Sequence, residues 1–272
     1  MLNHPAIDPI AISLGPLQIH WYGISYLLAF ATAWYLARRN ARRPWSPLGE
    51  NQVEDLIVYG AWGVIAGGRL GYMFFYNTDK WLANPAMLLR IWEGGMSFHG
   101  GLIGVAIAIF IYARKHRVSF LTLTDFAVPL VPTGLFFGRM GNFIGQELYG
   151  RPTDVPWGML FPSDPTQLPR HPSQLYEALL EGLVLFLIIS WFARKPRLAG
   201  EITGLFLVLY GCFRFMVEFV REPDAQFAGQ TAMIESLNWM TRGQALCIPM
   251  VLLGLWFMSK TMQRLMAKSA TN

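Results

Sequence analysis

The apolar stretch LTLTDFAVPLVPTGLFF, residues 121–137, runs directly into GRMGNFIGQELYGR, residues 138–151. The first stretch is close to the length of a membrane span, because a helix needs about 20 mainly apolar residues to cross a bilayer. The second gathers two arginines, an asparagine, a glutamine and a glutamate where that span should end. A membrane boundary needs only a positive charge or an aromatic anchor. Together the two stretches predict a membrane helix that ends in a polar site.

The composition of the whole chain agrees with a membrane protein. Of its 272 residues, 53% are apolar and only 14% are charged, whereas soluble domains carry about 25% charged residues. The sequence therefore predicts an all-α, polytopic fold, a single integral membrane domain over residues 1–272. The seven expected spans are 17–37, 53–75, 95–113, 120–138, 174–193, 200–220 and 243–259.

The basic residues are distributed unevenly between the loops. The loops after the first, third and fifth spans, together with the C-terminal tail, hold 13 of the 22 lysines and arginines. Because positive residues collect on the cytoplasmic side, this bias predicts an N-terminus outside and a C-terminus inside. The net charge of +5 is therefore a topology signal, and nucleic acid is not an expected partner.

Three outside loops, about 76–94, 139–173 and 221–242, are expected to form a small periplasmic cap. The middle loop contains six prolines and cannot be a continuous helix. The first loop contains WLANPAMLLRIWEGG, which we expect to lie flat in the membrane interface. Within RHPSQLYE, residues 170–177, Ser173 is a candidate helix cap, and His171 and Glu177 are assigned no role.

Arg214 is the most unusual residue of the predicted spans, because a charge inside a bilayer needs a partner or a use. Tyr210, Arg214 and Glu218 are spaced four residues apart and Arg221 follows, so all four share one helix face. One interpretation is a structural Arg214–Glu218 pair that reaches toward the surface. The other is a binding role, since a buried pair alone rarely justifies its desolvation cost.

A second group of polar residues surrounds Arg139. Asn142 and Glu147 follow within two turns, and glycines offer a backbone that bends closely around a ligand. Arginine suits a phosphate because its planar fork donates two parallel hydrogen bonds. His99 is either a helix-end residue or a proton carrier, and Tyr22 either belongs to the interfacial aromatic belt or to the site. The topology places one set near the outer leaflet: Tyr22, Arg69, His99, Arg139, Asn142, Glu147, Arg214 and Glu218.

Metal chemistry is not expected. The five histidines are scattered, and Cys212 and Cys247 fall in predicted spans without a paired spacing. No HExxH motif or acidic doublet at ligand spacing is present. Several arginines without metal ligands instead favour an anionic lipid headgroup, and the sequence gives no sign of a cofactor.

The stretch GRMGNFIGQELYGR resembles the signature G-R-x-G-N-F-x-N-x-E-x-x-G of the bacterial phosphatidylglycerol–prolipoprotein diacylglyceryl transferases. Similar likenesses lie in IHWYG (19–23), GGMSFHGGLIG (94–104), RHPSQLYEALLEG (170–182) and YGCFRFMVEFVREPDAQF (210–227). The resemblance covers almost the entire chain. It departs at Gly145, where the family has asparagine, so a side-chain amide there is absent or supplied by Gln146. The loop before RHPSQ is also shorter than in longer family members.

The resemblance implies an inner-membrane enzyme with seven spans and its active site toward the periplasmic leaflet. Its reaction transfers a diacylglyceryl group from phosphatidylglycerol to the lipobox cysteine of a preprolipoprotein. A thioether forms and glycerol 1-phosphate leaves, in the first step of lipoprotein maturation. The residues that carry over are Tyr22, His99, Arg139, Asn142, Gly150 and Arg214, with Glu147 and Glu218 in supporting roles.

The expected chemistry needs no enzyme nucleophile, because the substrate brings its own thiol. Arg139 and Arg214 would stabilise the negative charge that develops on the leaving phosphate. The thiol reacts as a thiolate, and His99, which we favour, or Glu147 would remove its proton, unless the arginines alone lower the thiol pKa. The residues by themselves also allow two other functions: a transporter or carrier of an anionic lipid or solute, and a non-catalytic lipid-binding scaffold.

Overall fold

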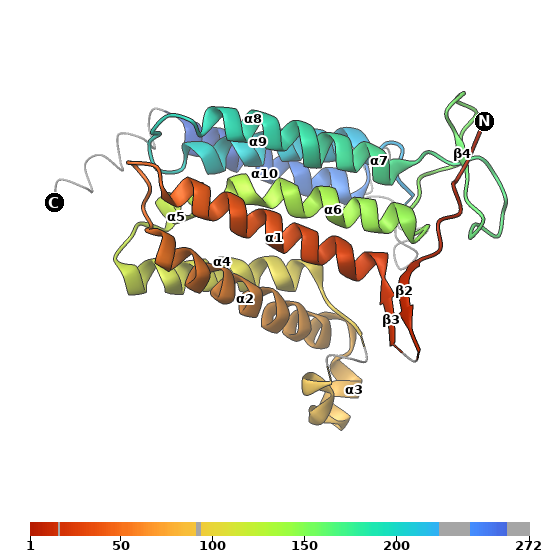
Figure 1. Cartoon of the computed structure of the whole chain (residues 1–272), viewed down its shortest axis with the longest axis horizontal. Coiled ribbons are helices and arrows are strands. Elements are labelled where there is room, and N and C mark those ends of the chain that lie inside the picture. The colour runs from red at the N-terminus through yellow and green to blue at the C-terminus, as the bar shows by residue number, and fades with distance from the viewer. Residues whose placement is uncertain (16, 91–93, 223–239, 260–272) are drawn as a thin grey trace. The chain divides into compact units, whose positions relative to one another are not determined.

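The computed structural model describes residues 1–15, 17–90, 94–222 and 240–259. The chain is mostly helical (Figure 1) and forms two compact units. The first unit comprises Met1–Leu36 and Ala127–Asn272, and the second comprises Ala37–Phe126. The predicted loop 221–242 lies largely outside the described residues, as do Ile91 and Trp92 of the predicted interfacial segment.

Each of the seven predicted spans falls on helix. The first two are α1 (Trp21–Ala41) and α2 (Glu50–Tyr76), and the third is α4 (Phe98–His116). The fourth is a continuous run of α5 (Phe120–Ala127), η3 (Val128–Leu130) and α6 (Val131–Ile144). The fifth is α7 (Ser173–Glu177), the π-helical turn η4 (Ala178–Val184) and α8 (Leu185–Phe192). The last two are α9 (Glu201–Val217) and α10 (Arg242–Met258).

Most boundaries differ from the prediction by a few residues, and two of the differences change the element in which residues lie. The first helix begins at Trp21 rather than 17, because β2 (Ile10–Leu14) and β3 (Leu17–His20) form an antiparallel hairpin before it. The loop expected from residue 139 begins only after α6, so Arg139 and Asn142 lie on helix. No proline interrupts 133–144, and the backbone therefore continues its hydrogen bonding to Ile144.

The first unit is held together by contacts between helices at small residues. Gly204 of α9 and Gly254 of α10 lie so close that an added Cβ on Gly254 would sit 2.6 Å from the Gly204 carbonyl oxygen. Gly182 of η4 packs just as closely against Phe136 of α6, so an added Cβ on Gly182 would collide with that side chain. Leu185, Ile189 and Ile202 of the same unit form a buried hydrophobic core. Close backbone approach of this kind is how helices pack where no water drives them together.

The second unit is built on α2 packed against α4. A Cβ on Gly63 would lie 2.7 Å from the Gly104 carbonyl oxygen, and one on Gly71 would lie 2.7 Å from the Gly100 Cα. Two short helices follow α2, namely α3 (Thr78–Ala83) and η1 (Pro85–Leu89). Helix η1 and the end of α3 lie within the segment predicted to rest in the interface.

The loop after α6 is joined to the N-terminus. Strand β1 (Leu2–Asn3) pairs in parallel with β4 (Met159–Leu160). Next to this pair, His4 lies 2.9 Å from the carbonyl oxygen of Phe143, near the end of α6. The N-terminal residues therefore brace the loop against the last turn of α6.

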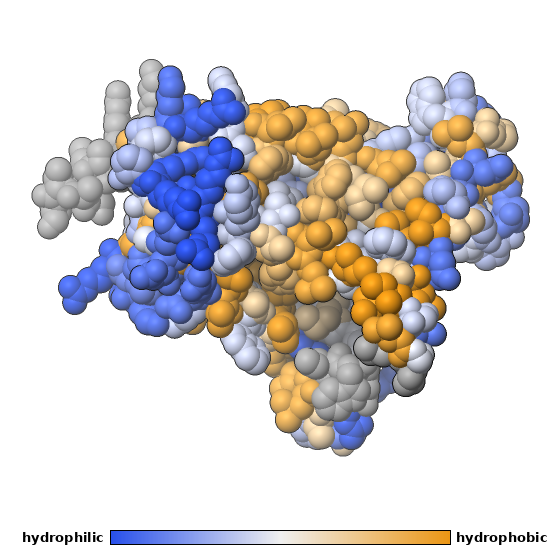
Figure 2. Space-filling view, viewed as in Figure 1, coloured by the Kyte–Doolittle hydropathy of each residue, from blue (hydrophilic) through white to orange (hydrophobic). Residues whose placement is uncertain are grey.

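The surface of the helices is apolar and several of their buried positions are polar. Figure 2 shows hydrophobic residues over much of the visible surface, and side chains such as Leu187 and Trp191 are more than half exposed. Gln174, Glu177, Glu181 and Gln244 are among the largest side chains that are fully buried. Within the described residues, three helices are long and apolar enough to cross a membrane: Phe98–His116, Phe120–Ile144 and Ser173–Phe192. Exposed apolar surface of this extent is typical of a protein that contacts lipid.

Candidate functional site

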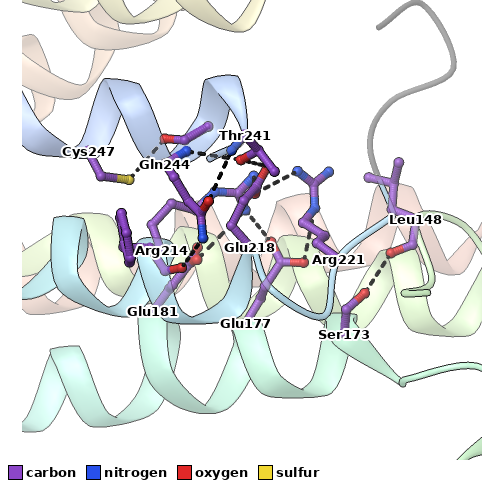
Figure 3. A network of polar contacts seen from close by, with 12 residues as sticks. Leu148, Ser173, Glu177, Glu181, Arg214, Glu218, Arg221, Thr241, Gln244 and Cys247 are labelled. Carbon is purple, nitrogen blue, oxygen red and sulfur yellow. Dashed lines mark hydrogen bonds and ion pairs between the residues drawn. The ribbon is translucent and has the colours of Figure 1, made fainter. Parts of the chain in front are cut away.

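Glu177 of α7 lies at the centre of a buried ion cluster in the first unit (Figure 3). Its Oε2 accepts from Arg214 Nη1 at 2.9 Å and forms an ion pair with Arg139 Nη2 at 2.7 Å. Its Oε1 lies 3.5 Å from Arg221 Nε. The carboxylate is fully buried, whereas the three arginine side chains keep 11 to 19% exposure. One glutamate thus gathers arginines from α6 and from the end of α9.

Glu218 forms a second centre of the same cluster. Its Oε2 lies 3.2 Å from Arg214 Nη2 and 3.9 Å from Arg221 Nη1, and its Oε1 accepts from Thr241 Oγ1 at 3.0 Å. Thr241 also caps α10, because its hydroxyl accepts from the Gln244 amide. The predicted Arg214–Glu218 pair is therefore present, and it is one link in a larger network rather than an isolated pair.

Glu181 completes the cluster one helical turn after Glu177. It is fully buried in the π-helical turn, and its Oε1 lies 3.8 Å from Arg214 Nη1. Within the described residues neither of its oxygens has a hydrogen-bond partner. Single π-helical turns occur frequently at functional sites, because they redirect the side chains of a helix.

The formal charges of this cluster balance. Arg139, Arg214 and Arg221 face Glu177, Glu181 and Glu218. Burying an ion costs several kcal/mol unless a partner compensates it, so removing any one member would leave an uncompensated charge. Arg139 and Arg214 share one acceptor atom, Glu177 Oε2, instead of each having its own.

A line of polar contacts extends from the cluster along α6. Arg139 Nη1 donates to Asn142 Oδ1 at 3.3 Å, and Asn142 Nδ2 donates to Glu147 Oε2 at 3.4 Å. Helix α1 packs against this line at Gly141, where an added Cβ would sit 3.1 Å from the Tyr22 ring. Tyr22 is exposed and its hydroxyl lies 3.2 Å from that of Tyr26. Four residues predicted for the site therefore lie together.

The glycines of the signature bend the backbone less than we expected. Gly145 ends α6 with a φ of −73°, while Gln146 and Leu148 adopt left-handed φ values of 55° and 56°. Gln146, the alternative source of a side-chain amide, accepts from the Ser163 backbone amide through its Oε1 at 2.9 Å. Gly150 serves packing, since an added Cβ would lie 2.9 Å from the His171 carbonyl oxygen and overlap that of Val220.

A second ion cluster organises the loop after α6. Arg170 Nε lies 2.7 Å from Asp164 Oδ2, its Nη2 donates to Thr166 Oγ1 at 3.0 Å, and its Nη1 lies 3.1 Å from Glu222. Burial alone would raise the pKa of the Asp164 carboxyl, but the hydrogen bonds from Arg170 and Thr166 outweigh it and hold the pKa below its ordinary value. The pair fixes the middle of the loop.

Arg69 and His99 belong to the second unit. The Arg69 guanidinium donates to backbone carbonyls of the loop that follows α2, at 3.2 Å for Leu88 and 2.8 Å for Arg90, with further bonds to Met87, Gly94 and Gly95. These contacts give Arg69 a role in holding that loop. His99 lies in the first turn of α4, is exposed, and stacks edge-on against Phe98.

Sequence reasoning missed Glu177 and Glu181. The signal was available, because two glutamates four residues apart stand in the otherwise apolar run ALLEGLVLFLIISW and its preceding turn. Intramembrane acids spaced in this way lie on one helix face and require partners. The described residues contain no group of three His, Cys, Asp or Glu side chains that could hold a metal ion.

Comparisons with known proteins identify relatives over the whole length of the chain. The family model described as prolipoprotein diacylglyceryl transferase matches residues 9–260. A relative from Methylococcus capsulatus is 56% identical over 258 residues, 94% of this chain and 95% of that one. One from Acinetobacter baylyi is 53% identical over 97% of this chain and 96% of its own. One from Pseudomonas fluorescens is 51% identical over 99% of each chain. All three are named phosphatidylglycerol–prolipoprotein diacylglyceryl transferase.

Proposed function

The chain belongs to the prolipoprotein diacylglyceryl transferase family, and from this premise we propose how its residues perform the transfer. The substrates are phosphatidylglycerol and the lipobox cysteine of a preprolipoprotein. The thiol sulfur attacks the glycerol carbon and forms a C–S bond while the C–O bond to phosphate breaks. The thiol proton is released, and glycerol 1-phosphate leaves with the bonding electrons. A thioether-linked diacylglyceryl protein is the product.

One observation carries the assignment of the phosphate site. Arg139 and Arg214 come from different helices, yet both contact the same carboxylate oxygen, Glu177 Oε2, at 2.7 and 2.9 Å. The two guanidinium groups are held close enough for one oxygen atom to contact both. This arrangement is preorganised to bind a phosphate oxygen. As the C–O bond breaks, the phosphate gains charge, and fixed donors in a site of low dielectric constant stabilise that charge most.

Glu177 holds these two arginines in register, Glu218 pairs with Arg214, and Arg221 contacts both glutamates. Asn142 links Arg139 to Glu147, so Glu147 is placed to orient the donors or to accept the thiol proton. His99 is the other candidate for the base. Tyr22, beside Gly141 of α6, is the proposed substrate-contacting position, and Gly150 contributes through its packing against Val220 and His171. Arg69 contributes through the loop that its guanidinium organises.

We also infer the arrangement in the membrane. Seven helices cross the bacterial inner membrane, with the N-terminus outside and the C-terminus in the cytoplasm. The support for this topology is the excess of basic residues in the loops after α1, α4 and α8. The ends of α6 and α9 that carry Arg139 and Arg214 then face the periplasmic leaflet, where the signal peptide of a translocated preprolipoprotein presents its cysteine.

The test is a proteoliposome assay with phosphatidylglycerol and a short lipobox peptide that carries one cysteine. The peptide mass should increase by one diacylglyceryl group while glycerol phosphate appears. Both products should be lost together in Arg139→Ala and Arg214→Ala. Arg197→Ala is the matched control, because Arg197 is exposed and bonds only to Phe192 among its described contacts.

Binding of phosphatidylglycerol without either product would contradict the transferase and favour a carrier of anionic lipid. The base is tested separately with His99→Gln and Glu147→Gln. The base is the residue whose loss lowers kcat and removes the corresponding limb of the pH profile. A His99→Gln variant of full activity would exclude His99 from this role.

A further inference from the structure

Ser173 and Gln174, at the start of α7, face the turn that carries Glu147. Both side chains are fully buried. Ser173 Oγ donates to the carbonyl oxygen of Leu148 at 3.0 Å, a bond drawn in Figure 3, and Gln174 Nε2 donates to that of Glu147 at 2.7 Å. Two neighbouring side chains therefore hold two successive carbonyl groups of one turn.

The turn they hold is conformationally costly. Gln146 and Leu148, on either side of Glu147, both have left-handed backbone conformations, which non-glycine residues rarely adopt. Such conformations persist only where the surrounding structure enforces them, and they cluster at functional sites. Glu147 itself is exposed, so its carbonyl could turn to water once its donor is removed. Without Ser173 and Gln174 the turn would be free to relax.

The geometry of this turn determines where the Glu147 carboxylate lies. Its Oε2 reaches Asn142 Nδ2 at 3.4 Å, and Asn142 Oδ1 accepts from Arg139. The Glu147 amide also donates to the Asn142 carbonyl oxygen at 2.9 Å. A change in the turn would therefore be passed to Asn142 and to one of the two arginines of the phosphate site.

Gln174 is a poor choice for stability alone. Its Oε1 is buried and has no hydrogen-bond partner among the described residues. A buried acceptor without a partner loses its hydrogen bonds to water and gains no replacement, so its desolvation costs free energy. Methionine has a similar length, and at this position it would give up one hydrogen bond but also remove the unsatisfied acceptor. Gln174 adds little net stability but fixes a strained turn. A role in placing Glu147 therefore explains this glutamine better than a role in stability.

We propose that Ser173 and Gln174 are positioning residues for the transfer reaction, which hold the Gln146–Leu148 turn so that Glu147 stays on Asn142. This proposal rests on the proposed function. Neither side chain contacts the reacting atoms. They act through the backbone carbonyls of residues 147 and 148.

The first test compares Gln174→Met with wild type in the proteoliposome assay. We expect kcat to fall about 100-fold, the effect of displacing a reacting group by about 1 Å, while the KM for phosphatidylglycerol stays within about twofold. The thermal midpoint should change little. Gln52→Met is the matched control, because Gln52 Oε1 accepts from the Gly49 backbone amide at 2.9 Å in the second unit. It should leave kcat unchanged.

The second test follows backbone hydrogen exchange. In Gln174→Met the segment 145–150 should exchange faster than in wild type, while exchange elsewhere stays the same. Ser173→Ala should behave in the same way, and Ser173→Thr, which keeps the hydroxyl donor, should restore both exchange protection and kcat. This pair carries the test if Gln174→Met fails to fold.

Wild-type kcat in Gln174→Met and Ser173→Ala would overturn the proposal, as would a raised KM with unchanged kcat. Faster exchange over the whole first unit would also overturn it, because that result indicates a general structural role. Failure of the proposed function is a different outcome, in which wild-type protein makes no product. The exchange measurement would then still decide whether the two residues hold the turn, and unchanged protection of 145–150 would refute this.

Discussion

Two buried ion clusters of the first unit use the same residue types in different ways. Around Arg170, every guanidinium nitrogen has an acceptor: Asp164 accepts from Nε and Nη2, Thr166 also accepts from Nη2, and Glu222 accepts from Nη1. Around Glu177, one carboxylate oxygen serves two arginines. The first cluster is saturated and joins the loop after α6 to Glu222 beyond α9, and the second is shared between helices.

We interpret this difference as one between a structural role and a functional role. A saturated pair cannot exchange a partner without losing charge-assisted hydrogen bonds, so it fixes its loop in one conformation. A shared cluster can turn its arginines toward an incoming phosphate, because each of them already divides its donors between several acceptors. Glu181, which has no hydrogen-bond partner among the described residues, extends this contrast. The following predictions test whether stability and activity divide between the two clusters in this way.

The largest effect is expected on stability, from Arg170→Met in the saturated cluster. It leaves Asp164 buried without its partner, and breaking a buried pair in this way costs about 3 to 5 kcal/mol. The free energy of unfolding of the first unit should fall by that amount in chemical denaturation. The kcat of the molecules that remain folded should stay close to that of wild type. If Arg170→Met lowered kcat without lowering stability, the Arg170 cluster would be functional, and the proposed division of roles between the two clusters would be wrong.

The next effect is on activity, from Arg214→Lys in the shared cluster. Lysine keeps the charge but offers a point charge instead of a planar fork, so it cannot contact Glu177 and Glu218 together. We expect kcat/KM to fall about 100- to 1,000-fold, the range for loss of one preorganised donor. Arg197→Lys in the exposed loop after α8 is the control. Wild-type turnover in Arg214→Lys would exclude the proposed phosphate role.

The sequence predicted more of the helices than of the site. Long apolar runs located every helix that carries a cluster residue, because burial in lipid constrains composition directly. The β2–β3 hairpin was missed, since IAISL reads as part of an apolar run until the pairing with Leu17–His20 is known. Arg139 and Arg214 were found from their charge. Their common partner Glu177 was not, because partner choice depends on which helices pack together.

Arg69 shows the same limit from the other side. The predicted topology placed it at the depth of the other arginines, but depth does not say where a side chain points. The structure directs its guanidinium to the carbonyls of Leu88 and Arg90, because the loop after α2 folds back over it. Its acceptors are backbone carbonyl oxygens. Every residue has one, so the sequence does not indicate which of them accept from Arg69.

A smaller effect is expected at two glycines of the signature. Gly150→Ala should lower the free energy of unfolding by about 1 to 3 kcal/mol, as overpacking does, because the new methyl group would overlap backbone atoms of Val220 and His171. Gly138→Ala is the matched control. It lies on α6 with open space around the position of a Cβ, so it should be neutral or stabilise the protein by up to about 1 kcal/mol. Equal effects at the two positions would contradict the packing role of Gly150.

The smallest effect, absent at neutral pH, is a dependence of the saturated cluster on acid. Because its hydrogen bonds hold the pKa of Asp164 below the ordinary value of 3.8, the stabilisation is complete above that value and is lost as the pH falls through the lower, folded-state pKa. Backbone exchange of the loop after α6 should therefore become faster below about pH 4, with Asp164→Asn abolishing this dependence. If wild type and Asp164→Asn responded alike to acid, the change would arise from other carboxylates, and the Arg170 cluster would not be the element that fixes this loop.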